Sequence, residues 1–124
     1  MHTTILISGY RNYTDYDAFK SVLDKHTKDI KQPIKIIHGG ATGADALAGR
    51  YATEYKHDVQ VFPADWRKHG NAAGPIRNAE MLQQKPDVCV MFMHADSKGT
   101  KNMLKLCKAH KKMYPNFQWV VVDI

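Results

Sequence analysis

The regular alternation between short apolar runs and longer segments with helical spacing is the feature that most constrains the fold. Five β-branched or apolar runs are predicted as strands, at 3–9, 33–40, 58–66, 87–94 and 117–124. Four segments between them have helical periodicity, at 15–29, 42–56, 74–84 and 99–113. This alternation predicts an α/β fold, a Rossmann-like open parallel sheet of about five strands with helices on both faces.

The length of 124 residues fits a single domain, 1–124, with one core. No apolar run approaches the roughly 18 residues that span a membrane, and the N-terminus lacks the basic and apolar regions of a signal peptide. We therefore expect a cytoplasmic protein with no membrane partner. Cys89 and Cys107 lie in a predicted strand and a predicted helix, and we expect both to be reduced core thiols.

The formal net charge of +6 suggests an anionic partner. Much of the excess lies in the last predicted helix, where lysines at 101, 105, 108 and 112 share one helical face. This face is interpreted either as a solvated outer surface or as a track for nucleic-acid phosphates or an acidic partner.

Ligands of open parallel sheets bind beyond the carboxyl ends of the strands, so the loops there are the places to search. The first of these loops begins after Gly9 and contains Arg11, a candidate ligand contact. The segment 63–73 is the longest connection, and we expect a binding loop there. Its Trp66 is predicted either to stack on a base or to cover the core.

The stretch "HGGATGAD" follows the second strand and contains Gly39, Gly40, Thr42, Gly43 and Asp45. It matches neither the dinucleotide fingerprint nor a Walker A loop. Glycines permit close backbone approach and the following helix offers free N–H groups, but the aspartate would repel a bare phosphate. We expect this stretch either to be a purely structural turn or to form the backbone side of a ligand site. In the second case, Thr42 and Asp45 would face the sugar or base of a nucleotide.

The stretch "SKGTKN" precedes the last helix and is the better candidate for a phosphate, because it has no aspartate. Ser97, Gly99 and Thr100 would hold the anion. Arg77 and Asn78, early in the preceding helix, are predicted to point toward the same place, Arg77 as a fork for phosphate or carboxylate. The alternative for Arg77 is a pair with a surface acid.

The histidines give no metal site. His38 ends a strand and is predicted to be a hydrogen-bonded structural residue, while His69 and His94 have no partner at ligand spacing. We assign no metal and no cofactor.

Four stretches, "SGYRNYTDYDAF", "HGGATGADALA", "FPADWRKHGNAAGPIRNAEML" and "SKGTKNML", together resemble the SLOG superfamily. The chain is most similar to its small stand-alone branch related to YspA and cpYpsA, found in bacteria and phages. Relatives include the Lonely-guy phosphoribohydrolases, which cleave nucleoside monophosphates, and the DNA-processing protein DprA. The resemblance implies a Rossmann-like fold, a nucleotide-type ligand and a homodimer.

The resemblance places the glycine-rich turn of that branch at 39–45, and it places Arg77 and Asn78 where the hydrolases carry an Arg-Lys pair. Gly99 and Thr100 match the end of the hydrolase motif PGGxGTxxE. The sequence departs from the motif around them, because Asp96 and Ser97 replace its first glycines, and Asn102 and Met103 stand where glutamates are expected.

Cleavage of an N-glycoside needs a carboxylate, and the remaining candidates are Asp45, Glu80 and Asp96. Three functions stay open. The chain binds a nucleotide or nucleotide-derived signal without turning it over, or it hydrolyses a nucleotide N-glycoside with a displaced acid, or it binds single-stranded nucleic acid.

Overall fold

The computed structural model describes residues 2–124 and contains one five-stranded sheet in the order β3-β2-β1-β4-β5, with every neighbouring pair parallel. The strands are β1 (Thr3–Gly9), β2 (Ile34–His38), β3 (Asp58–Val61), β4 (Val88–Met93) and β5 (Gln118–Asp123). The helices are α1 (Tyr16–Thr27), α2 (Ala44–Glu54), α3 (Trp66–His69), α4 (Ala73–Gln83) and α5 (Lys98–Met113), with a 3₁₀ turn η1 (Gly70–Ala72). The predicted α/β fold is confirmed.

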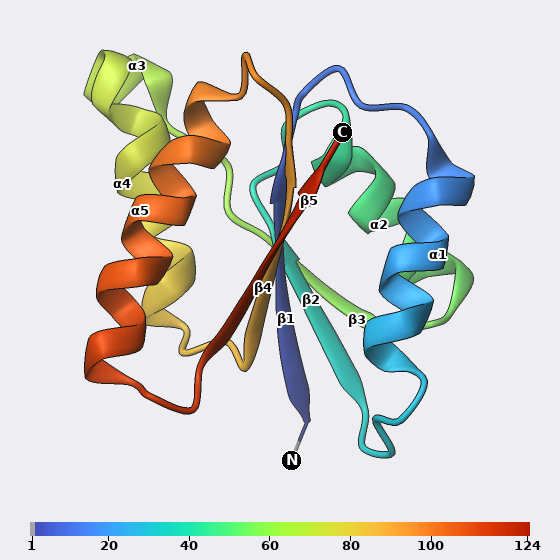
Figure 1. Cartoon of the computed structure of the whole chain (residues 1–124). Coiled ribbons are helices and arrows are strands. Elements are labelled where there is room, and N and C mark those ends of the chain that lie inside the picture. The colour runs from blue at the N-terminus through green and yellow to red at the C-terminus, as the bar shows by residue number, and fades with distance from the viewer. Residues whose placement is uncertain (1) are drawn as a thin grey trace.

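The helices cover both faces of the sheet, as Figure 1 shows with the sheet seen nearly on edge. On one face, α1 and α2 bury Phe19, Leu23 and Ala48 against β1, β2 and β4. On the other face, α4 and α5 bury Met81 and Met103 against the opposite sides of the same strands. Because the central strands are covered twice, their sequences are apolar almost throughout.

The two cysteines lie within the second of these cores, as predicted. Cys89 and Cys107 are fully buried and free, and burial raises the pKa of the Cys89 thiol well above its usual value. A neutral thiol in an apolar site is a small core residue.

The segment after the third strand differs from the prediction. β3 ends at Val61, just before Pro63, where the sequence within 58–66 predicted that the strand stops because proline cannot donate to the sheet. The expected loop 63–73 contains α3 and η1, and Asp65 begins α3 by accepting a hydrogen bond from Lys68 N at 3.1 Å. Sequence periodicity did not find α3 because four residues are too few to show it.

The strand order reverses between β1 and β4, and we call this point the switch. The chain moves from β1 outward to β2 and β3, and then crosses back to place β4 on the other side of β1. Loops that leave adjacent strands in opposite directions open a crevice at their carboxyl ends, which is where open α/β sheets bind ligands. No helix within residues 2–124 is long and apolar enough to cross a membrane.

Candidate functional site

The candidate site lies at the carboxyl edge of the sheet, where the loops 10–15, 39–43 and 94–97 follow β1, β2 and β4. Two aromatic side chains meet at the switch itself. Tyr10, directly after β1, stacks on His94, directly after β4, with ring centroids 4.2 Å apart and planes 12° apart. Both rings are half-buried, so this pair forms part of the surface at the switch.

The glycine-rich turn, residues 39–43, packs tightly against the loop after β1. Gly43 has φ +73°, and a Cβ there would lie 2.3 Å from the carbonyl carbon of Arg11. Thr42 Oγ1 donates to Arg11 O at 2.9 Å, and Ala44 N donates to Tyr10 O at 3.1 Å. Protein contacts therefore account for the glycine at 43 without any ligand.

Gly9 and Gly40 are also required by close packing. A Cβ at Gly9 would lie 2.6 Å from the Cβ of Ala44 and 2.8 Å from that of Phe92. Gly40 has φ +72°, and its N–H donates to Nδ1 of His38 at 3.0 Å. His38 is buried, which lowers its imidazole pKa, and it makes the structural hydrogen bond expected of it.

Asp45 lies in the first turn of α2 and holds the glycine-rich turn together. Its Oδ2 atom accepts hydrogen bonds from the backbone N–H groups of Gly39 (3.1 Å) and Ala41 (3.2 Å). The side chain is buried, and this desolvation raises the pKa of the carboxyl to about 6, although the two hydrogen bonds and the nearby Arg77 charge act in the opposite direction.

Arg77 and Asn78 link the two glycine-containing segments of the edge. Arg77 Nη1 donates to Gly39 O at 2.7 Å, and Arg77 Nε donates to Asn78 Oδ1 at 3.0 Å. Asn78 Nδ2 in turn donates to Gly99 O at 3.2 Å and to Asn102 Oδ1 at 3.0 Å. The guanidinium is thus directed to the glycine-rich turn, and the amide of Asn78 is the group that reaches α5.

This network departs from two expectations. Arg77 is neither beside 97–100 nor paired with a surface acid, since its Nη1 and Nε atoms donate to Gly39 O and to Asn78. Asn102, at a position where the hydrolase motif has a glutamate, uses its amide oxygen for Asn78. That position therefore carries a structural link in this chain.

The α5 start, residues 97–100, is the open counterpart of the glycine-rich turn. Ser97 Oγ accepts from His94 N at 3.0 Å and does not cap the helix. The backbone N–H groups of Gly99 and Thr100 have no hydrogen-bond partner among residues 2–124. A Cβ built on Gly99 would meet nothing within 4 Å and Gly99 is exposed, whereas Ser97 and Thr100 are buried, so open space lies beside Gly99.

The side chains of the other predicted contacts form no hydrogen bond with Arg77 or Asn78 within residues 2–124. Arg11 and Asp96 are exposed on the loops after β1 and β4, with Asp96 Oδ2 3.8 Å from His94 Nδ1. Glu80 is exposed on α4, and within residues 2–124 no hydrogen bond joins it to Asp45 or Asp96. Trp66 is 59% exposed on α3, so it does not cover the core. No group of three possible metal ligands occurs in the described part of the chain.

The stacked Tyr10–His94 pair is the feature that the sequence did not identify. Tyr10 was not a candidate, and His94 was considered only as a metal ligand. Each residue directly follows a strand, which is a usable signal. Their contact depends on β1 and β4 being neighbours, and strand order is not visible in a linear pattern.

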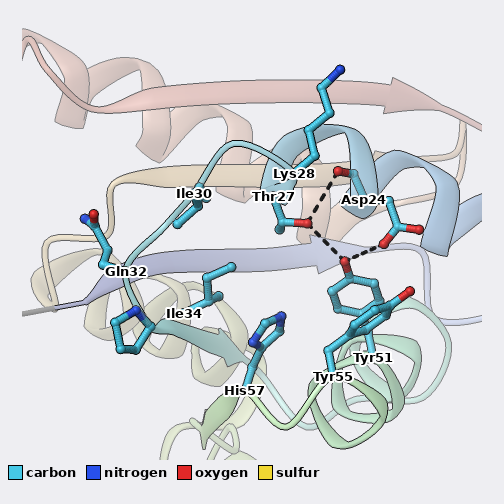
Figure 2. A pocket seen from close by; sticks show the side chains of 10 residues that line it. Asp24, Thr27, Lys28, Ile30, Gln32, Ile34, Tyr51, Tyr55 and His57 are labelled. Atoms are coloured by element: carbon cyan, nitrogen blue, oxygen red, sulfur yellow. Dashed lines mark hydrogen bonds between the residues drawn. The ribbon is translucent and has the colours of Figure 1, made fainter.

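A separate hollow of about 420 Å³ lies at the opposite, amino edge of the sheet (Figure 2). Tyr51, Tyr55 and His57 line it on one side, and Tyr51 donates to Asp24 Oδ1 at 2.8 Å. Thr27 Oγ1 lies 3.2 Å from the Tyr51 hydroxyl. Burial raises the Tyr51 pKa, Asp24 raises it further, and the contact with Thr27 acts in the opposite direction. Asp24, Thr27 and Tyr51 are thus hydrogen-bonded to one another and join α1 to α2.

Comparisons with known proteins agree with the resemblance. A model of the YspA, cpYpsA-related SLOG family matches residues 3–69, a span from β1 through α3 that contains the glycine-rich turn. The "Gene 61 protein" of Mycobacterium phage D29 is 32% identical over 106 residues, covering 82% of this chain and 85% of that protein. No solved structure matches.

Proposed function

Because the chain belongs to the YspA, cpYpsA-related SLOG family, we propose that its carboxyl edge binds a nucleotide or nucleotide-derived signal molecule, as a sensing or sequestering module. The observation that carries the proposal is the α5 start. The N–H groups of Gly99 and Thr100 at this helix N-terminus have no hydrogen-bond partner within residues 2–124, and open space lies beside the exposed Gly99, next to the switch point of the sheet. Such donors suit a phosphate.

The stacked pair and the glycine-rich turn support the same assignment. Tyr10 and His94 provide flat aromatic surface next to the α5 start, because His94 N bonds to Ser97. A base can stack on such a surface. Thr42 and Asp45 remain proposed contacts for the sugar or base. Arg77 remains a proposed ligand contact beside the glycine-rich turn, because its Nη2 atom has no partner within residues 2–124.

Isothermal titration calorimetry against nucleotides, cyclic nucleotides and ADP-ribose derivatives tests the proposal, guided by mass spectrometry of any small molecule that co-purifies. The decisive variant is Gly99→Asp. The added side chain enters open space, and a carboxylate in the first turn favours the helix, so the fold should persist. The same charge should repel phosphate and weaken binding at least about tenfold, because two like charges about 4 Å apart near a protein surface repel by roughly 4 kcal/mol.

The matched control is Gly99→Asn, which adds nearly the same volume without the charge and should bind more tightly than Gly99→Asp. Equal binding by both variants and the wild type would contradict the assignment of phosphate to the α5 start. Absence of binding to the entire panel by the folded wild type would contradict the proposed function.

A second candidate is hydrolysis of a nucleotide N-glycoside, favoured by the pKa of Asp45, which at about 6 suits a general acid or base near neutral pH. Incubation with AMP, deoxynucleoside monophosphates and modified nucleotides should then release free base. Asp45→Asn should abolish the release, whereas Glu80→Gln and Asp96→Asn should not. Unchanged turnover in Asp45→Asn would exclude this mechanism.

We also propose a homodimer. Val59 and Val61 on the edge strand β3 are each 46% exposed, and Trp66 follows them in the chain. Exposed apolar side chains that lie along a sheet edge are typical of interfaces. Light scattering after gel filtration measures the mass directly, and a mass of one chain at micromolar concentration would exclude the dimer.

A further inference from the structure

The entire formal net charge of the chain is carried by one segment, residues 97–122. This segment contains six lysines and no aspartate or glutamate, whereas the other residues contain 12 basic and 12 acidic side chains. All six lysines belong to α5. The excess positive charge is therefore a local property of one helix.

The structure provides no acidic partner for these lysines. The ion pairs within residues 2–124 are Lys20–Asp24 and the close His94–Asp96 contact, and neither includes a lysine of α5. Lys101 Nζ donates to Ala95 O, and Lys111 Nζ donates to Phe117 O at 2.6 Å, so these two have structural contacts. We call the remaining exposed lysines of the outer face, Lys105, Lys108 and Lys112, the lysine face.

The lysine face opposes the stability of the helix that carries it. Like charges three or four residues apart cost about 0.2–0.5 kcal/mol per pair, and Lys105, Lys108 and Lys112 form two such pairs. Burial of Met103 and Cys107 on the other side holds α5 in place. Folding therefore does not account for the lysine face, which favours a ligand outside the chain.

A polyanion with regularly repeating charge fits this face best. Successive lysines rise about 4.5–6 Å along the helix axis, so several phosphates of one strand can be contacted at once. Lys108 Nζ lies 5.9 Å from the ring centroid of the half-buried Trp119, which adds aromatic surface beside the charges. A membrane surface fits poorly, because the apolar side of α5 is buried against the sheet and is not free to insert.

We propose that the lysine face binds the phosphate backbone of single-stranded nucleic acid, without regard to sequence. A flexible single strand can adjust its phosphates to the lysine spacing and bring bases to neighbouring aromatic surface, whereas the phosphates of a duplex are fixed. Lysine binds phosphate as a point charge, and contacts to phosphate carry no sequence information. This surface is separate from the proposed nucleotide site and does not depend on it.

Fluorescence anisotropy with a labelled single-stranded 20-mer, measured between 50 and 200 mM salt, tests the proposal. Three phosphate contacts predict that log K falls with log salt with a slope of about −2 or steeper. The triple variant Lys105→Ala/Lys108→Ala/Lys112→Ala should reduce the slope by about 2 and weaken binding at least about tenfold. Its thermal stability should equal or exceed that of the wild type, since the repulsion is removed.

The matched control is Lys25→Ala/Lys28→Ala/Lys31→Ala, which removes the same charge from exposed positions in and after α1. It should retain nearly wild-type affinity. Equal weakening in both triple variants would assign binding to net charge and overturn the proposal. Absence of binding at 50 mM salt, or tighter binding to a duplex of the same sequence, would also overturn it.

Discussion

The glycine-rich turn and the α5 start look alike in sequence but are opposite in structure. Both place glycine and hydroxyl residues where a helix begins after a strand, at the same edge of the sheet. In the turn, Cβ atoms at Gly39 and Gly43 would collide with Arg77 and with the Arg11 backbone. At the α5 start, a Cβ on Gly99 meets nothing. Glycine alone therefore does not mark a phosphate site, and the space beside it has to be known.

The largest expected effect is that of Gly43→Ala. The backbone at 43 (φ +73°, ψ −127°) is unfavourable for alanine, and the new Cβ would press on backbone atoms that cannot move away. We expect a loss of about 4 kcal/mol or more in the free energy of unfolding, measured by urea denaturation.

Gly70→Ala is the control that separates contact from strain. Gly70 has nearly the same backbone angles (φ +56°, ψ −135°), but a Cβ there meets nothing within 4 Å. It should lose only the strain energy, about 1–3 kcal/mol. Equal losses at 43 and 70 would show that packing against Arg11 contributes nothing.

The next effect concerns Asp45 and pH. Since burial raises its folded pKa from 3.8 to about 6, the folded state favours the protonated acid, and its contribution to stability is complete below pH 4 and lost as the pH rises through 6. Asp45→Asn does not titrate, and its amide oxygen can accept both N–H groups, because both now donate to Oδ2. The variant should gain up to about 3 kcal/mol relative to wild type between pH 4 and 7.

Urea denaturation of both proteins at pH 4, 5, 6 and 7 provides the comparison. Other carboxylates contribute equally to each protein, so their effect cancels in the difference. A difference that stays constant over this range would show that Asp45 titrates at its ordinary pKa.

A smaller loss of stability is expected from changes at Gly39 and Arg77, which connect the glycine-rich turn to α4. Gly39→Ala would place its Cβ 2.1 Å from Arg77 Nη1, a flexible group that can withdraw at the cost of its bond to Gly39 O. We expect losses of about 1–3 kcal/mol for Gly39→Ala and for Arg77→Ala alone. The double variant should lose less than the sum, because the collision disappears with Arg77. Strict additivity in denaturation experiments would contradict this contact.

The smallest expected effect, and the one of opposite sign, is that of Gly99→Ala. The helical backbone at 99 accepts alanine and the space is open, so stability should rise by about 0.4–1 kcal/mol. Thermal denaturation of the Gly99→Ala and Gly43→Ala variants compares the open α5 start directly with the packed glycine-rich turn. A destabilised Gly99→Ala variant would mean that the α5 start is packed rather than open.

Much of this molecule could be predicted locally. The alternation of apolar runs and helical segments predicted the parallel sheet, and Asp15, directly before α1, caps that helix by accepting a hydrogen bond from Ala18 N at 3.1 Å. Local patterns succeed in these cases because strand burial and helix capping depend on residues a few positions apart. The sequence also predicted that the lysines at 101, 105, 108 and 112 share one face of α5, because they repeat with the helical period.

The candidate site was only partly predictable. The loops at the carboxyl edge could be selected because parallel strands end there together, but the partners of Arg77 and Asn78 could not. Gly39 lies 38 residues from Arg77, and Gly99 lies 21 residues from Asn78. Such contacts depend on how α4 sits between the ends of β2 and β4.

The sequence by itself therefore determined the type and order of the elements and the edge of the sheet at which polar loops gather, since hydrophobic periodicity and chain direction are local properties. Only the tertiary structure decided which strands and side chains lie next to one another. It brought Tyr10 onto His94 across the switch, filled the space at Gly43 and left it open at Gly99. The physical reason is that strand order and packing are set by burial across the whole sheet, which no short stretch of sequence records.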